Sequence, residues 1–117
     1  MQDFKLLLDS RLWKIAQHVM PIDTQSAQHL LDPVEIGKRL YATRTALEMT
    51  QAAFADRLGM SQSTYALYET GKRMLPPRWA VAIALKFRVS TDWLYLGDAS
   101  GIAYTLHEKI MGVLPRN

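Results

Sequence analysis

The sequence of 117 residues contains no cysteine, and it has no run of about 18 apolar residues, the length that a membrane-spanning helix needs. The first absence excludes disulfide bonds, thiolate nucleophiles and cysteine-based zinc sites. The second excludes a transmembrane helix and a membrane partner. We therefore expect one domain with a single modest core, in a reducing compartment, and we place the protein in the cytoplasm.

Patterns that carry catalytic or metal chemistry are missing as well. The three histidines, His18, His29 and His107, lie far apart in the sequence, and none has a carboxylate four residues away that would complete a ligand pair. The chain has no glycine-rich phosphate loop and no evident pairing of a nucleophile with a base. We expect no enzyme activity, no catalytic residue, no metal, no cofactor and no small-molecule ligand.

Acidic residues are absent between Lys72 and Arg88, where five cations occur. The net charge of the whole chain is only +3, so the placement of the charges carries more information than their sum. Two interpretations remain open for this run. It is either a solvated face or an edge that meets phosphate groups.

The spacing of the apolar residues predicts an all-α fold, because no stretch alternates long enough to indicate a strand. Thr50, Ser61 and Ser90 are placed to cap helices, Gly59 ends one, and Pro77 suits the start of another. An additional amphipathic helix is predicted over 3–19. The expected organisation is an N-terminal helix and linker (1–33), a five-helix domain (34–98, with helices near 34–47, 51–58, 62–69, 77–87 and 91–96) and a tail (99–117) with a short helix near 103–112.

The stretch TQAAFADRLGMSQSTYALYE predicts two short helices joined at Gly59. In the second helix, Tyr65 and Tyr68 have the spacing of a face that points to the core. The opposite face then holds small polar residues at the amino end, where free backbone N–H groups favour anions and side chains can reach base edges. The small side chains of the first helix are expected to let the two helices approach closely; these are Ala52, Ala53 and Ala55.

The stretches IGKRLYATRTALEMTQAAFADRLGMSQSTYALYETGKR and VSTDWLYLGD resemble the Cro/C1-type helix-turn-helix family, also called the XRE family. The resemblance runs from about Ile36 to Asp98, roughly half of the chain. Each piece alone is weak, but all of them in the family's order and spacing are specific. The resemblance implies a lambda-repressor-like five-helix domain that binds double-stranded DNA in a sequence-specific way. It also implies a transcriptional regulator, a repressor, that acts as a homodimer.

The resemblance also implies roles for particular positions. It places base reading on Gln62, Ser63, Ala66 and Leu67. It places phosphate contacts on Gln51, Thr64, Thr70, Lys72 and Arg73. It pairs Arg44 with Glu69 in a structural salt bridge.

Three positions depart from the family pattern. Leu67 stands where arginine or glutamine is common, so it is either a contact to a thymine methyl, a partly exposed core residue or a contact to another protein. Thr70 stands where asparagine is common. Arg88 stands where glycine is usual, and it must either adopt a positive φ or change the turn.

Two segments leave alternatives open. In the last helix, Trp93 and Leu96 are expected in the core, and Leu94 and Tyr95 are left for a partner subunit. The predicted helix over 3–19 either packs on the domain, joins two subunits or is not a folded element. An alternative function follows, an antitoxin-like or scaffold module for protein interaction in which DNA binding is secondary.

Overall fold

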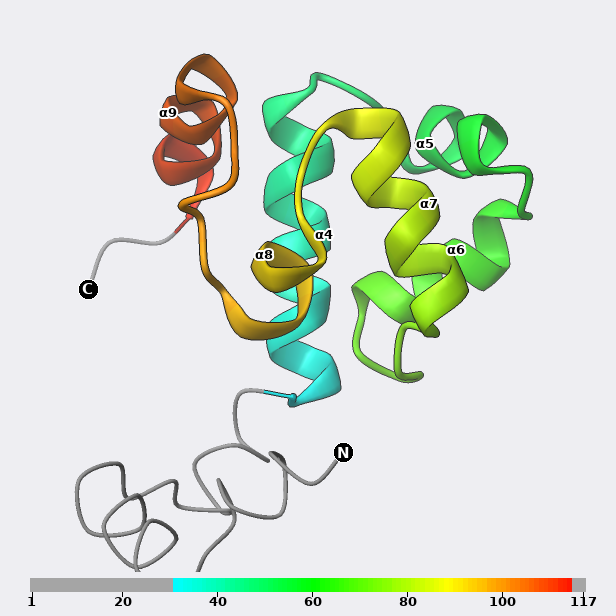
Figure 1. Ribbon diagram of the computed structural model, residues 1–117. Helices are drawn as coiled ribbons and strands as arrows, with labels where there is room; N and C mark the ends of the chain where they lie inside the picture. Colours follow the sequence, from blue (N-terminus) through cyan, green and yellow to red (C-terminus); the bar gives the residue numbers. More distant parts are fainter. Residues whose placement is uncertain (1–30, 115–117) are drawn as a thin grey trace, which may run out of the picture.

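The computed structural model describes residues 31–114, and the regular elements of this part are all α-helices (Figure 1). The predicted all-α class is therefore confirmed, and each helix expected between 34 and 112 forms within one residue of its predicted bounds. The predicted helix over 3–19 lies outside the described residues. None of the helices between 31 and 114 has the length and hydropathy to cross a membrane. The helices are α4 (Pro33–Ala46), α5 (Gln51–Leu58), α6 (Gln62–Glu69), α7 (Pro77–Phe87), α8 (Thr91–Leu96) and α9 (Tyr104–Val113).

Side-chain caps fix the starts of most of these helices. In each case an oxygen just before the helix accepts a hydrogen bond from a backbone N–H of the first turn, which otherwise has no partner. Helix α7 instead starts at Pro77, whose missing N–H costs nothing at that position. The caps are Asp32 for α4, Thr50 for α5, Ser61 for α6 and Ser90 for α8.

Three helices end in a left-handed residue. Gly59 after α5 and Gly97 after α8 both have φ of 77°, which glycine adopts without a Cβ clash. Arg88 after α7 has φ of 58° in the same region. Of the two alternatives for Arg88, the structure shows the positive φ.

Helix α4 lies at the centre of the molecule, with α9 on one side and α5, α6 and α7 on the other (Figure 1). Leu40 of α4 is fully buried, and so is Ile110 of α9. Phe54 of α5 stacks on Phe87 of α7 with ring centroids 4.3 Å apart, and it lies 5.0 Å from the ring of Tyr65. These aromatic contacts tie the helix-turn-helix pair to α7.

The prediction for α8 was wrong at two leucines. Leu94 is fully buried and Leu96 is 47% exposed, whereas the reverse was expected. Because α8 packs against both α4 and α7, its adjacent positions Trp93 and Leu94 are both covered. The hydroxyl of Tyr95 donates to the backbone oxygen of Leu75 at 2.7 Å. Leu94 is therefore not available to a partner subunit.

A close approach between two helices occurs at Gly37, a residue that the sequence analysis did not single out. Ala52 and Ala53 are exposed, because the first turn of α5 faces solvent, and only Ala55 is buried. Instead, α4 meets α6 at the buried Gly37. A Cβ at this position would overlap the backbone oxygen of Glu69 and lie 2.9 Å from that of Tyr68.

A buried hydrogen-bond network joins α4 to α8. The indole Nε1 of Trp93 donates to the hydroxyl of Thr43 at 3.0 Å, and that hydroxyl donates to the backbone oxygen of Arg39 at 2.7 Å. The guanidinium of Arg39 donates to the backbone oxygens of Leu94 and Tyr95 at 3.1 and 3.0 Å. Arg39 thus satisfies the free carbonyls at the carboxyl end of α8.

Candidate nucleic-acid interface

One face of helix α6 packs against the core, and the other face is open to solvent at its amino end. Tyr65 is fully buried and Tyr68 is 7% exposed. Gln62 and Ser63, at the amino end of the helix, are exposed. Ala66 and Leu67 lie on the same side, but they are partly buried. The polar end of α6 is therefore the most accessible part of the helix.

The hydroxyls around the start of α6 form a local network. Ser61 Oγ accepts from the backbone N–H of Thr64 at 3.2 Å and donates to the Thr64 hydroxyl at 2.8 Å. It also lies 3.3 Å from Ser63 Oγ. The Thr64 hydroxyl keeps its own proton free to donate outward. Ser61 therefore positions two of the candidate contact residues, a role that the cap signal in the sequence indicates only indirectly.

Glu69, near the end of α6, is linked to two other helices. Arg44 of α4 donates to both of its carboxylate oxygens, through Nε at 2.9 Å and Nη2 at 2.8 Å. Gln51 of α5 donates to Oε1 at 3.2 Å. Arg44 Nη1 also donates to the backbone oxygen of Met49 at 2.9 Å. A single carboxylate therefore fixes α4, α5 and α6 relative to one another.

The electrostatics of this cluster follow from its partial burial. Burial alone would raise the pKa of Glu69, but the hydrogen bonds from Arg44 and Gln51 favour the carboxylate and lower the pKa overall. The hydroxyl of Tyr65 is buried beside the pair and has no hydrogen-bond partner of ordinary geometry within 31–114. Burial raises the pKa of this hydroxyl far above its usual value, so Tyr65 stays neutral.

The loop after α6 carries two exposed cations, Lys72 and Arg73. It is anchored by the backbone N–H of Arg73, which donates to the oxygen of Leu67 at 3.1 Å. Gly71 has φ of 77°, and a Cβ there would lie 2.7 Å from the Cα of Val34. The loop is thus held against the start of α4, with both cations in solvent beside α6.

Thr70 uses its donors within the protein. Its hydroxyl donates to the backbone oxygen of Ala66 at 2.7 Å, and its backbone N–H donates to the same oxygen at 3.0 Å. A phosphate oxygen accepts hydrogen bonds and needs a free donor. Gln51, in contrast, gives only one of its two amide hydrogens to Glu69.

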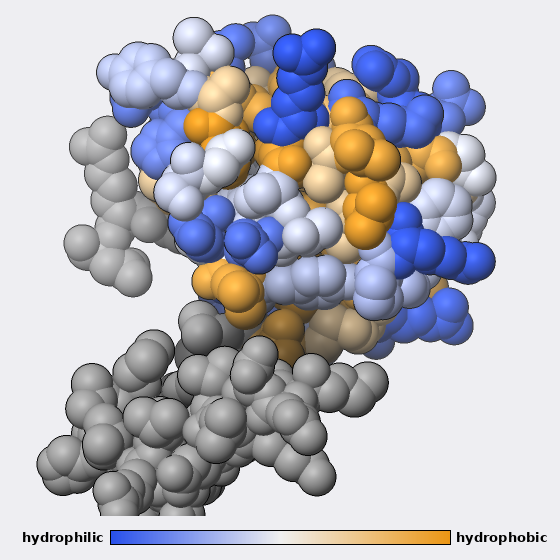
Figure 2. Space-filling view, viewed as in Figure 1, coloured by the Kyte–Doolittle hydropathy of each residue, from blue (hydrophilic) through white to orange (hydrophobic). Residues whose placement is uncertain are grey.

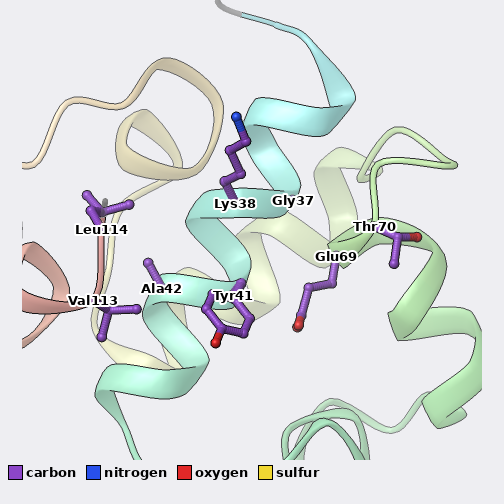
Figure 3. A pocket seen from close by; sticks show the side chains of 8 residues that line it. All are labelled: Gly37, Lys38, Tyr41, Ala42, Glu69, Thr70, Val113 and Leu114. Atoms are coloured by element: carbon purple, nitrogen blue, oxygen red, sulfur yellow. The ribbon is translucent and has the colours of Figure 1, made fainter. Parts of the chain in front are cut away.

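A cavity of about 380 Å³ lies at the carboxyl end of α6, where Glu69 and Thr70 are part of its lining. Figure 3 shows α4 as its floor, with Tyr41 and Ala42 facing it, the end of α6 on one side and the end of α9 on the other. Its lining is mostly apolar and includes Val113 and Leu114. Among the described residues, His, Asp and Glu side chains form no group of three that could hold a metal ion.

Comparison with known families agrees with this geometry. The family model described as Helix-turn-helix matches residues 40–94, from within α4 to within α8. Comparison with curated proteins and with solved structures gives no match. The match includes α5, the turn at Gly59 and α6. The chain therefore contains, over these residues, a DNA-binding domain of the Cro/C1-type helix-turn-helix family, the XRE family.

Proposed function

We propose that the protein is a transcriptional regulator, a repressor, that binds specific double-stranded DNA sites as a homodimer. The observation that carries the proposal is the amino end of α6, where Gln62 and Ser63 are exposed while Tyr65 and Tyr68 hold the helix in the core. A helix presented in this way can enter the major groove with its first turn against the base edges. Occupation of a promoter site by such a domain would block transcription.

In this proposal, Gln62 and Ser63 read bases directly. A glutamine amide can donate to and accept from the edge of adenine at the same time, whereas a serine hydroxyl tolerates several bases. Ala66 and Leu67 lie further along the helix and can only make apolar contacts, which favour a thymine methyl group. The preference at their positions is therefore expected to be weaker than at the base that meets Gln62.

Phosphate contacts are proposed for Gln51, Thr64, Lys72 and Arg73. Each has a free donor or a charge in solvent: the second amide hydrogen of Gln51, the hydroxyl of Thr64 and the two exposed cations. Thr70 is left out, because both of its donors are used by Ala66. These contacts would position α6 on the duplex without reading its sequence.

The homodimer requires a surface other than the one expected on α8, where Leu94 is buried. Val81 and Leu85 lie one turn apart on α7 and are 48% and 78% exposed. Figure 2 shows apolar side chains at the surface over α7. We propose this stripe as the subunit contact. Leu85→Lys should then leave the fold unchanged and reduce the mass of the protein in solution to that of one chain.

The test is a selection of bound duplexes from a random DNA pool at near-physiological salt. An enriched, roughly palindromic motif is expected, because two related α6 helices would meet half-sites about 34 Å apart. Gln62→Ala should reduce the discrimination between sequences by about 1–3 kcal/mol for the lost base contact. Arg73→Ala is the matched control and should weaken the binding of all sequences alike.

A folded protein that enriches no motif would contradict this proposal. Unchanged discrimination in Gln62→Ala would contradict the assignment of base reading to that residue. In the first case, the antitoxin-like or scaffold function becomes the better explanation, and the open apolar surfaces of the domain become the sites to test.

A further inference from the structure

An open apolar groove lies where the described part of the chain begins. It has a volume of about 380 Å³ and is lined by Leu31, Met74, Pro77, Tyr95 and Leu96, among others. Three of these side chains are large, apolar and nearly half exposed: Leu31 at 44%, Met74 at 44% and Leu96 at 47%. Such a cluster on one groove indicates a surface that another apolar element covers.

The sequence supplies a candidate for that element. The segment 3–19 has apolar residues at helical spacing, and a helix of this length would be roughly 26 Å long. Eleven residues, 20–30, connect it to Leu31, and they span at most about 40 Å. Because Leu31 itself lines the groove, the segment is tethered at the place where the groove opens. Its apolar residues are Phe4, Leu7, Leu8, Leu12, Ile15 and Val19.

The tether favours the segment of the same chain over a second copy. A linker of eleven residues gives an effective concentration on the order of millimolar, well above a protein concentration in the micromolar range. The segment 3–19 itself holds three cations and two aspartates, so its charge does not favour either occupant.

The other apolar cavity, behind Glu69, fits this role less well. Its lining includes the charged side chains of Lys38 and Glu69, and Leu31, where the tether joins the described residues, is not part of that lining. The groove at Leu31 has no carboxylate in its lining except Asp92 at the start of α8. We propose that the segment 3–19 docks as an amphipathic helix in the groove lined by Leu31, Met74 and Leu96 of its own chain.

The absence of native cysteine allows a direct test with the full-length chain. Leu12→Cys, on the apolar face of the segment, is combined with Leu96→Cys in the groove. Two matched pairs serve as controls. Lys14→Cys with Leu96→Cys places the first thiol about 200° further round the same helix. Leu12→Cys with Tyr41→Cys probes the other cavity.

Disulfide formation in a glutathione buffer, at low micromolar protein and without DNA, measures the effective concentration of each thiol pair. We expect the Leu12–Leu96 pair to exceed both controls by at least about tenfold, in a product with the mass of one chain. In concentrated urea the difference should vanish. Thermal melts show whether each variant folds, and Met74→Cys replaces Leu96→Cys if the latter does not.

Three results would overturn the proposal. Equal values for the three pairs would mean that the segment does not dock in the groove. A preference for the Tyr41 pair would place it in the cavity behind Glu69. A disulfide that joins two chains would mean that the segment covers the groove of a second copy.

Discussion

At the scale of single residues, the side chain of Glu69 links three helices. It accepts hydrogen bonds from Arg44 of α4 and from Gln51 of α5, while it belongs to α6. The Arg44 and Glu69 side chains are only 14% and 7% exposed. A partly buried ion pair of this kind fixes geometry more than it adds stability. It therefore sets the angle at which α6 leaves the core, and it holds Gln51 beside α6.

Replacement of Arg44 should leave the carboxylate of Glu69 without its ion-pair partner and so destabilise the folded state. We expect Arg44→Leu to lower the free energy of unfolding by about 3 kcal/mol at pH 7, because Glu69 stays partly buried without its partner. The Arg44–Glu69 pair lowers the pKa of Glu69 in the folded state. Its stabilisation is therefore present above the unfolded-state pKa, about 4.3 for a glutamate, and is lost as the pH falls through the lower folded value.

Urea unfolding at pH 7 and pH 3 tests this expectation. The difference between the wild type and Arg44→Leu should be smaller at pH 3 than at pH 7. Lys38→Leu is the control, because its ion pair with Glu35 is at the surface and should change the stability by less than about 0.5 kcal/mol. An equal loss for Arg44→Leu at both pH values would show that packing, and not charge, causes the effect.

Arg88 carries backbone strain that glycine would relieve. Its φ of 58° lies in the left-handed region, which costs a non-glycine residue roughly 1–2 kcal/mol. The greater freedom of glycine in the unfolded chain offsets part of the gain. We expect Arg88→Gly to raise the free energy of unfolding by about 0.5–1 kcal/mol in urea titrations.

Gly59→Ala is the reciprocal control for Arg88. The residue has φ of 77°, and an added Cβ would have nothing within 4 Å, so backbone strain alone would act. A loss of about 1 kcal/mol is expected. If Arg88→Gly is instead less stable than the wild type, the arginine side chain makes a contribution that outweighs the strain of its backbone.

At the scale of the helices, the crossing of α4 and α6 depends on Gly37. An added Cβ would overlap the backbone of Glu69, which cannot move like a flexible side chain. We expect Gly37→Ala to lower the free energy of unfolding by about 1–3 kcal/mol through overpacking. Because the contact is with the carboxyl end of α6, the same change should also weaken DNA binding.

Gly112→Ala provides the matched control in another helix. It lies in α9, and an added Cβ would meet nothing within 4 Å. The better helix propensity of alanine should therefore raise the stability by up to about 1 kcal/mol. Thermal unfolding of both variants distinguishes the effects. Equal shifts of the same sign would contradict the role given to Gly37.

The helix bounds could be predicted because their signals are local. Thr50, Ser61 and Ser90 each cap the helix that follows, and Gly59 ends α5 in the left-handed conformation. Such signals act over one turn of the chain and need no knowledge of the tertiary contacts. The spacing of Tyr65 and Tyr68 is similarly local, and it was sufficient to predict which face of α6 is buried.

The errors in the predicted burial arise where contacts between helices, and not local sequence signals, determine which side chain is buried. In the six residues of α8, the sequence allows either Leu94 or Leu96 to face inward, and packing against two helices selects Leu94. The same holds for the candidate site. The link from Gln51 to Glu69 and the cap that Arg39 provides for α8 join residues distant in sequence, and no spacing rule indicates them.

At the scale of the whole molecule, only part of the basic run lies near α6. Lys72 and Arg73 follow that helix directly. Arg78 and Lys86 are exposed on α7 and lie about 12 Å apart along its axis, so the five cations do not form one compact patch. Under the proposed function, Lys72 and Arg73 form the phosphate-facing part of the run, and Lys86 belongs to its solvated part.

The salt dependence of DNA binding separates these two parts. The logarithm of the affinity should fall linearly with the logarithm of the salt concentration, with a slope of about −0.9 for each phosphate that the protein neutralises. Arg73→Ala should reduce the steepness of the slope by about 0.9. Lys86→Ala is the matched control, because its cation is exposed near the end of α7 and should leave the slope unchanged.

Titrations of one duplex over a range of salt concentrations measure these slopes. Equal changes for the two variants would mean that the phosphate path also covers the far end of α7. An unchanged slope for Arg73→Ala, with the affinity of the wild type retained, would mean that the loop after α6 does not touch the DNA backbone. In that case Gln51 and Thr64 would be the remaining phosphate contacts that position α6 in the major groove of the DNA.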